Sequence, residues 1–278
     1  MNFYPAFSPR GSARPSRGLS SLGCHELNLV ETLALAARND IGAVELRSLG
    51  GDLDLPSWLA KEYGAPVDLA RAWPVGAARL VGLNTSFKLG KNDEASRADL
   101  LGFVPWAEAL GVPWLRVFDG CASTDEADLR AAADTLAWWR DLRREKGWRT
   151  DFMIETHDAL VTAPNLLRLM ELAPGAAILW DTHHTWKKGG EDPVATWSAI
   201  RDHVVHVHVK DSISRPSARH NFTYVLPGDG EFRLRPVLDV LERDGYTGVV
   251  SLEWERQWHP YLPPLEVALR VADERGWW

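Results

Sequence analysis

The chain has 278 residues, of which 45% are hydrophobic and 25% charged, the composition of a soluble globular protein with ample apolar surface for a core. Asp and Glu outnumber Lys and Arg by 38 to 31, and the net charge of −7 argues against nucleic acid as the main partner, because phosphate binding needs a basic surface. No segment is apolar for the length of a membrane span. The two cysteines, Cys24 and Cys121, cannot form a disulfide framework, which favours a reducing, cytoplasmic location.

Residues 1–17 contain Arg10, Arg14 and Arg17 with no apolar run between them, a pattern unlike that of a secretory signal. We expect this segment to be a flexible tail and residues 18–278 to form a single domain.

After Gly18, short apolar runs alternate with stretches of helical periodicity. The expected strands cover residues 19–22, 42–46, 80–84, 114–118, 151–155, 177–181, 203–209 and 249–253. The expected helices cover residues 27–38, 56–73 with a break at Gly64 and Pro66, 95–110, 125–146, 165–172, 193–202, 235–243 and 264–275. The helix over 125–146 should begin with a capping box formed by Ser123 and Glu126.

Eight alternations of strand and helix predict a parallel sheet, because parallel neighbours need a crossover connection and a helix supplies it. Eight such units close naturally into a (β/α)₈ TIM barrel. An open doubly wound sheet is the alternative, but no Gly-x-Gly-x-x-Gly motif follows an early strand.

Four consecutive predicted strands end in side chains that can bind a metal. These residues are Glu155, Asp181, His208 and Glu253, and they occupy equivalent points of the repeat. The C-terminal ends of barrel strands form the active-site face, so we expect the four side chains to lie side by side. Buried carboxylates are costly to desolvate unless they are paired or bind a cation. The sequence therefore predicts one divalent metal. Mn²⁺ is the preferred candidate, with Mg²⁺, Co²⁺ or Zn²⁺ as alternatives.

Two of these assignments have close alternatives. His206 shares a strand face with His208, and we choose His208 because it is nearer the C-terminal end of the strand. Glu255 competes with Glu253, which directly ends the apolar run. Taken singly, a Glu or Asp that ends a strand is more often a loop residue or a helix cap than a metal ligand, and His206 by itself is typical of a core histidine.

Other polar and aromatic residues flank the predicted ligands. His157 and Lys210 are candidates for substrate contact or for orienting the ligands. Arg47 is a candidate substrate-binding residue, or it pairs with Glu45. Trp186 and Trp258 fall in predicted loops, where they could cover a sugar or simply pack.

By strand parity, Trp180 and Trp254 should face away from the ligands and pack in the core.

The chain resembles the metal-dependent sugar isomerases and epimerases with a xylose-isomerase-like TIM barrel. The matching segments are 44–47 (VELR), 154–157 (IETH), 181–184 (DTHH), 206–211 (HVHVKD), 227–230 (PGDG) and 252–255 (LEWE). The Lys210-Asp211 pair is closer to the inosose-dehydratase-like and sugar-phosphate-isomerase-like branches. The ketose 3-epimerases instead carry an arginine shortly after the strand-seven histidine, and Arg215 does not align cleanly with it.

The resemblance implies that Glu155, Asp181, His208 and Glu253 coordinate one divalent metal. It implies that Glu155 and Glu253 exchange a carbon-bound proton of the substrate, and that His184 contacts substrate hydroxyls.

Removing a proton next to a carbonyl gives an enediolate, which a metal stabilises and a positioned carboxylate helps to form. Return of the proton gives isomerisation or epimerisation of a sugar or cyclitol, whereas loss of a neighbouring hydroxyl gives dehydration of an inosose or keto-sugar. A metal-dependent endonuclease and a non-catalytic sugar-binding barrel are the competing hypotheses. A nucleophilic hydrolase is disfavoured, since the sequence contains no Gly-x-Ser-x-Gly motif. The sequence leaves open whether the chain forms a homo-oligomer.

Overall fold

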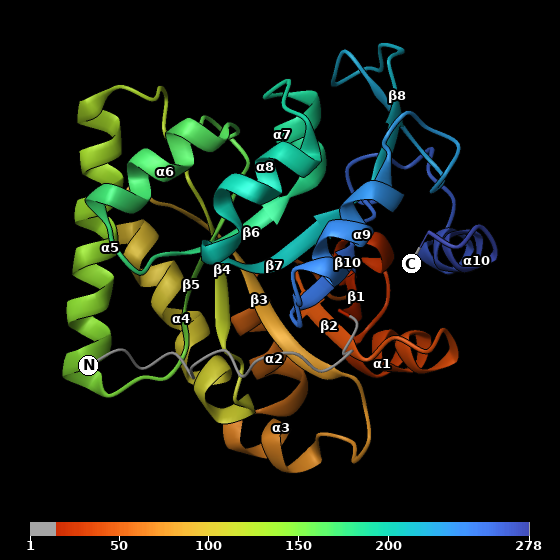
Figure 1. Cartoon of the computed structure of the whole chain (residues 1–278). Helices are drawn as coiled ribbons and strands as arrows, with labels where there is room; N and C mark the ends of the chain where they lie inside the picture. Colours follow the sequence, from red (N-terminus) through yellow and green to blue (C-terminus); the bar gives the residue numbers. More distant parts are fainter. Residues whose placement is uncertain (1–14, 278) are drawn as a thin grey trace.

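The computed structural model describes residues 15–277 and contains a closed barrel of eight parallel strands. In barrel order the strands run β1, β10, β7, β6, β5, β4, β3, β2, and β2 closes the ring by pairing with β1. Their bounds are β1 Ser16–Ser20, β2 Ala43–Leu46, β3 Arg79–Lys88, β4 Trp114–Phe118, β5 Asp151–Glu155, β6 Ala177–Asp181, β7 Val204–Val209 and β10 Val249–Leu252. The predicted single-domain (β/α)₈ barrel is confirmed (Figure 1).

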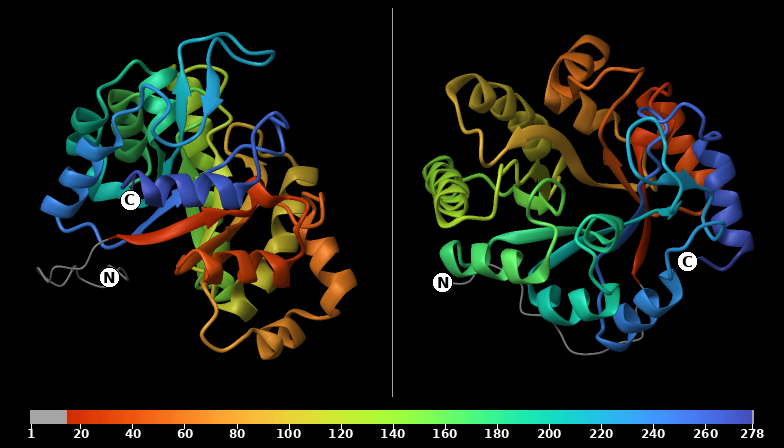
Figure 2. Two further views of the ribbon diagram at one scale, coloured as in Figure 1. Left: turned by 90° about the vertical axis from the view of Figure 1, so that its right-hand side faces the viewer. Right: turned by 90° about the horizontal axis from the view of Figure 1, so that it is seen from above.

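Helices connect the strands and surround the barrel, as the view from above shows (Figure 2). Their bounds are α1 Leu29–Arg38, α2 Leu55–Tyr63, α3 Pro66–Ala72, α4 Glu94–Leu110, α5 Glu126–Lys146, α6 Ala163–Leu172, α7 Thr182–Lys187, α8 Pro193–Ile200, α9 Leu234–Arg243 and α10 Leu265–Glu274. The expected break between α2 and α3 occurs at Gly64, whose φ of 76° suits a residue without a Cβ. Among the described residues, no helix combines the length and the apolar character needed to cross a membrane.

Two local predictions near helix and strand starts are wrong. The first strand covers Ser16–Ser20 rather than 19–22, and Ser21–Cys24 forms a 3₁₀ turn. The boundary expected between tail and barrel therefore falls inside β1, while residues 1–14 of the expected tail lie outside the described residues.

The capping box of Ser123 and Glu126 does not form. Asp125 caps α5 instead, because its carboxylate accepts hydrogen bonds from the amides of Ala127 and Asp128. Ser123 bonds the side chain of Asp128.

Two elements fall in segments that the sequence analysis treated as loops. Helix α7 follows β6 directly, and a hairpin of β8 (Asp211–Ile213) and β9 (Thr223–Val225) follows β7. Figure 1 shows the hairpin projecting from the same end of the barrel as α7. His183 of α7 and Ser212 of β8 join the two elements, with 2.8 Å between Nε2 and Oγ.

The barrel interior is unusually polar near its C-terminal end, where bulky apolar side chains commonly fill such barrels. It buries a carboxylate, a guanidinium and two imidazoles, none more than 2% exposed, on Glu45, Arg116, His206 and His208. Buried ionisable groups need partners, so this layer marks the place where the strands assemble a site.

Candidate metal centre

The structure brings together the four predicted ligands from the ends of β5, β6, β7 and β10. One ligand atom from each of Glu155, Asp181, His208 and Glu253 lies within 4.8 Å of the other three, and all four residues are buried. Parallel strands in a closed barrel end at one rim, which explains why residues far apart in sequence converge. The chain thus has a cluster that could hold a metal ion.

The alternatives to His208 and Glu253 occupy different places. His206 lies one alternation earlier on β7 and bonds Ser251 Oγ from its Nε2 at 2.9 Å. Glu255 accepts a hydrogen bond from the Tyr224 hydroxyl at 2.9 Å. Neither belongs to the group of four.

The hydrogen bonding of the cluster fits a cation. Glu155 Oε2, Asp181 Oδ2 and His208 Nδ1 are buried and form no hydrogen bond with any described residue. Burial, together with the neighbouring carboxylates of Glu253 and Glu155, raises the pKa of Asp181 to about 6. Each of the three atoms still has an ionic neighbour: Arg116 at 3.3 Å, Lys210 at 2.8 Å and Glu253 at 3.4 Å, respectively. Oxygen and imidazole donors gathered in such a buried cluster suit a divalent ion such as Mn²⁺.

Lys210 places an internal cation at the edge of this cluster. Its Nζ donates hydrogen bonds to Glu253 Oε2 at 2.5 Å and to Glu255 Oε1 at 2.6 Å, and lies 2.8 Å from Asp181 Oδ2. Burial alone would lower the pKa of Lys210, but these carboxylates outweigh it and hold the pKa well above its usual value. Lys210 therefore neutralises part of the acidic charge.

The pKa values of Glu253 and His208 are shifted in opposite directions. Burial would raise the pKa of Glu253, but the charges of Lys210 and His208 outweigh burial and keep it well below its usual value. Burial would lower the pKa of His208, yet Glu45 and Glu253 raise it well above its usual value. The carboxylate of Glu253 is thus held ionised.

The sequence analysis missed Arg116, which lies beside Glu155. Its Nε is 3.3 Å from Glu155 Oε2, and its guanidinium packs over the Phe118 ring at 3.9 Å. The signal in the sequence was an arginine inside the apolar run of β4, where a charge is costly without a partner.

Glu45 is a second residue whose partner the sequence could not identify. Its Oε1 lies 2.7 Å from His208 Nε2, and its Oε2 accepts a hydrogen bond from Asn84 at 3.1 Å. The alternative pairing with Arg47 does not form, because Arg47 instead donates to Ser86 Oγ at 3.0 Å and to the Asn84 carbonyl. Burial and the nearby Arg116 lower the pKa of Arg47 to about 9.

The two candidate substrate-binding histidines differ in access. His184 is 3% exposed, and its Nδ1 lies 2.9 Å from the Thr156 carbonyl and 3.2 Å from Asp181 Oδ2. The side chain of His157 is 32% exposed, and its Nδ1 lies 2.8 Å from Asp158 Oδ1. The two rings meet edge to face at 5.0 Å, so His157 is the more accessible neighbour of the cluster.

The tryptophans divide as follows. Trp180 and Trp254 are at most 1% exposed and belong to the core, as strand parity predicts. Trp186 lies in α7 rather than in the predicted loop; it is half-buried and packs against His183 of the same helix at 5.6 Å. Trp258 lines a groove of about 840 Å³ between the hairpin and the segment after β10, and none of the four clustered residues lines it.

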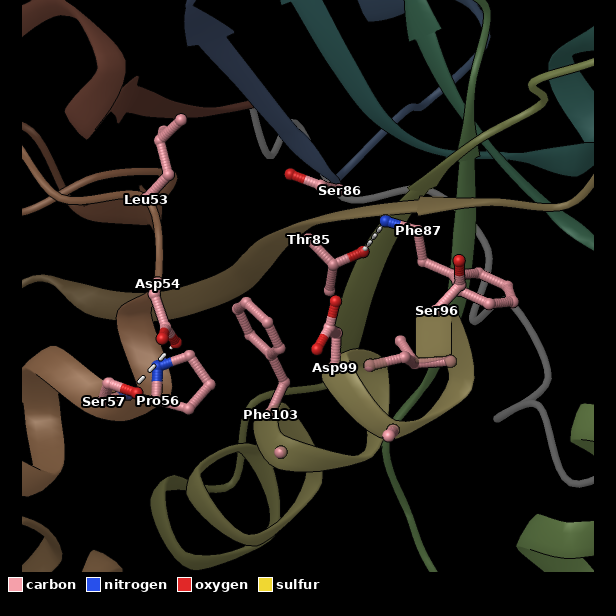
Figure 3. Close-up of a pocket in the computed structure, with 13 residues that line it drawn as sticks. Leu53, Asp54, Pro56, Ser57, Thr85, Ser86, Phe87, Ser96, Asp99 and Phe103 are labelled. Carbon is pink, nitrogen blue, oxygen red and sulfur yellow. Dashed lines mark hydrogen bonds between the residues drawn. The ribbon is translucent and has the colours of Figure 1, made fainter. Parts of the chain in front are cut away.

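A pocket of about 470 Å³ opens between α2 and α4 at the end of β3. Figure 3 shows the Phe103 ring between the carboxylates of Asp54 and Asp99, with Ser86 at the upper edge. None of the predicted site residues lines it, although Ser86 accepts a hydrogen bond from Arg47. This pocket is therefore separate from the metal cluster.

The chain is similar to known proteins over its sequence and its fold. Over 169 residues it is 25% identical to an inosose dehydratase from Lacticaseibacillus casei, covering 56% of each chain. Over 146 residues it is 29% identical to one from Klebsiella pneumoniae subsp. pneumoniae, covering 47% of this chain and 48% of that protein. The chain thus matches about half the length of these curated relatives.

Solved structures share the whole fold at low identity. A probable 3-DHS dehydratase involved in petrobactin synthesis from Bacillus anthracis superimposes with a TM-score of 0.74, at 16% identity, over 93% of this chain and 98% of that one. A xylose isomerase domain protein from Planctomyces limnophilus gives a TM-score of 0.66, at 17% identity, over 94% and 95% of the two chains.

The family model described as "Xylose isomerase-like TIM barrel" matches residues 33–276, which is most of the sequence and includes the four clustered residues. The chain therefore belongs to the xylose isomerase-like TIM barrel family.

Proposed function

We propose that the chain is a divalent-metal-dependent enzyme that removes a proton next to the carbonyl of a small sugar or cyclitol. The observation that carries this proposal is the convergence of Glu155, Asp181, His208 and Glu253, whose ligand atoms lie within 4.8 Å of one another. These four residues would hold one cation, with Mn²⁺ as the preferred candidate. When bound, the cation would supply Lewis-acid stabilisation of negative charge on a substrate oxygen.

Glu155 and Glu253 are the proposed acid–base pair. In barrel order β6 and β7 separate β5 from β10, so the two carboxylates reach the cluster from different sides. Glu253, held ionised by Lys210 and His208, presents a free carboxylate that can accept a carbon-bound proton, and its lowered pKa makes it a weaker base than an ordinary Glu. Glu155, beside Arg116, is suited to exchange a proton on the other side. A proton removed on one face and returned on the other gives epimerisation, and its transfer to the neighbouring carbon gives isomerisation.

Dehydration of an inosose or keto-sugar is the second candidate. The names of the relatives, which are dehydratases, make it as strong a candidate as isomerisation or epimerisation. In that reaction the carbon-bound proton again passes to a carboxylate, while a hydroxyl on the next carbon leaves with a second proton as water. Lys210 Nζ, which donates to both Glu253 and Glu255, is a buried donor beside the cluster that can hydrogen-bond the leaving hydroxyl.

His157, His184 and Arg47 are the proposed substrate contacts, with Trp186 and Trp258 as outer ones. We propose a small-molecule substrate and no nucleic acid partner, as the net charge of −7 suggests. A cytoplasmic location is proposed from the cysteine content alone.

The test is proton exchange in deuterated water. The Mn²⁺-loaded protein is incubated with ketoses, inososes and 3-keto sugars, and NMR follows deuterium incorporation and product formation. We expect exchange or water loss with one class, abolished in both Glu155→Gln and Glu253→Gln. Exchange with none of them, together with cleavage of abasic DNA, would establish the endonuclease hypothesis instead. Binding of a sugar without exchange would establish the non-catalytic barrel.

A further inference from the structure

We infer that Glu45 is a positioning residue that turns Nδ1 of His208 toward the metal cluster; this rests on the proposed function, because it concerns the same metal site. Glu45 lies in β2, outside the strands that carry the four clustered residues. It is completely buried, and its Oε1 lies 2.7 Å from His208 Nε2.

The contact leaves only one nitrogen of His208 for a metal. A neutral imidazole has one protonated nitrogen and one lone pair, and a partner on one nitrogen decides which is which. When His208 gives up a proton to bind a metal, the carboxylate of Glu45 keeps the remaining proton on Nε2. Nδ1 then carries the lone pair, and it lies on the other side of the ring, 3.4 Å from Glu253 Oε2.

Glu45 is itself held in place, as an orienting group must be. The Asn84 amide donates to its Oε2 at 3.1 Å. His206 Nε2 lies farther away, at 3.7 Å, and bonds Ser251 Oγ. Arg47, directly after β2, bonds Ser86 and the Asn84 carbonyl rather than Glu45. His208 is thus the nearest partner of this buried carboxylate.

A buried carboxylate is retained in a barrel only where a partner offsets its desolvation. Metal-binding histidines commonly present their second nitrogen to a carboxylate, and loss of that carboxylate costs about 10- to 100-fold in metal affinity. Without Glu45 the His208 ring is free to exchange tautomers and to turn, so the cluster should bind its ion more weakly.

Two measurements test this inference. Calorimetric titration with Mn²⁺ should give a dissociation constant about 10- to 100-fold higher for Glu45→Ala, and a smaller increase for Glu45→Gln, which keeps the side-chain shape. Asp151→Asn is the matched control: this carboxylate lies at the opposite end of β5, paired with Arg143 at 2.6 Å, and its loss should leave Mn²⁺ affinity unchanged.

NMR of the wild-type protein, labelled with ¹⁵N in histidine and loaded with ¹¹³Cd²⁺, should show metal coupling to Nδ1 of His208 and a proton on Nε2. Coupling to Nε2, or unchanged Mn²⁺ affinity in both Glu45 variants, would overturn the role of Glu45. The affinity of His208→Gln separates the two proposals. If that variant loses Mn²⁺ while Glu45→Ala does not, only the positioning role fails; if it binds like wild type, the metal site itself fails.

Discussion

Lys210 Nζ lies 2.8 Å from Asp181 Oδ2, so an internal ammonium group shares a carboxylate with the proposed metal site. The same nitrogen donates to Glu253, a second member of the cluster. Arg116 lies 3.3 Å from Glu155, so all three clustered carboxylates have a positive partner within the protein. This arrangement allows the barrel to fold without its metal, since paired buried charges cost far less than isolated ones.

Replacing Lys210 tests whether the metal-free barrel depends on this internal positive charge for its stability. Lys210→Met keeps the length of the side chain but leaves Asp181 and Glu253 short of a counter-charge. We expect the free energy of unfolding of the metal-free protein to fall by about 3–5 kcal/mol, the usual cost of breaking a buried ion pair. Added Mn²⁺ should stabilise the variant more than wild type, because the ion replaces the missing charge.

Urea unfolding with and without Mn²⁺ measures both effects. Lys88→Met is the matched control, because Lys88 is 44% exposed and pairs with Asp158 outside the cluster. A metal-free Lys210→Met protein as stable as wild type would contradict this account.

The raised pKa of Asp181 predicts how metal affinity depends on pH. Its value of about 6 lies above the usual 3.8, so in the metal-free protein this carboxyl is protonated below about pH 6. A metal requires the ionised form, so Mn²⁺ affinity should fall as pH decreases through 6, by at most about tenfold per pH unit for one proton. Above pH 6 the contribution of Asp181 should disappear, and the remaining dependence comes from His208, whose raised pKa means that it still releases a proton when it binds a metal.

Calorimetry in two buffers of different ionisation enthalpy should show about one more proton released on Mn²⁺ binding near pH 5 than at pH 8, because Asp181 is protonated only at the lower pH. Equal affinity at the two pH values would show that Asp181 does not titrate in this range or does not bind the ion.

The same shift predicts the stability of the metal-free protein. A carboxyl whose pKa is raised on folding favours the folded state most below 3.8, and this contribution is lost as pH rises to about 6. Asp181→Asn cannot ionise, so its free energy of unfolding should decrease less than that of wild type between pH 4 and 7. Parallel stability curves for the two proteins would be inconsistent with the shift.

Asp211 should be a structural residue, despite its place beside Lys210. Its carboxylate accepts backbone hydrogen bonds from Ser212, Gly228, Gly230 and Phe232, at 2.9–3.0 Å. Asp211→Ala should reduce the free energy of unfolding by about 3 kcal/mol, because several buried amides lose their acceptor.

Urea denaturation measures this loss, with Asp202→Ala as a control whose carboxylate is 90% exposed. Mn²⁺ affinity of the folded Asp211 variant should stay close to that of wild type. An unchanged urea midpoint would disprove the structural role.

His157 and Trp258 should differ in their effect on catalysis. The His157 ring neighbours His184 at the cluster, whereas Trp258 lines the groove beside the hairpin, apart from the four clustered residues. His157→Ala should lower kcat/KM in the exchange assay at least about tenfold, as the loss of one hydrogen bond of about 1.5 kcal/mol implies. Trp258→Phe should change kcat/KM by less than about threefold. The opposite ranking would place the substrate in the groove rather than over the cluster.

The sequence by itself determined the barrel and the types of residue at its rim. Alternating strands and helices require parallel pairing, and parallel strands bring their C-terminal ends to one edge. The bounds of β4, β5 and β6 were predicted without error, since each apolar run begins and ends sharply. The ends of β1 were misplaced, because polar Ser16 and Arg17 pair in the sheet despite their low strand propensity.

Only the tertiary structure decided which charges meet inside the barrel. Glu45 of β2 reaches His208 of β7 although β1 and β10 lie between their strands, and Arg116 reaches Glu155 of the next strand. Alternation along a strand shows which side chains share a face, but not which of them touch across a closed barrel. That choice depends on the register and closure of all eight strands, which is a long-range property of the fold.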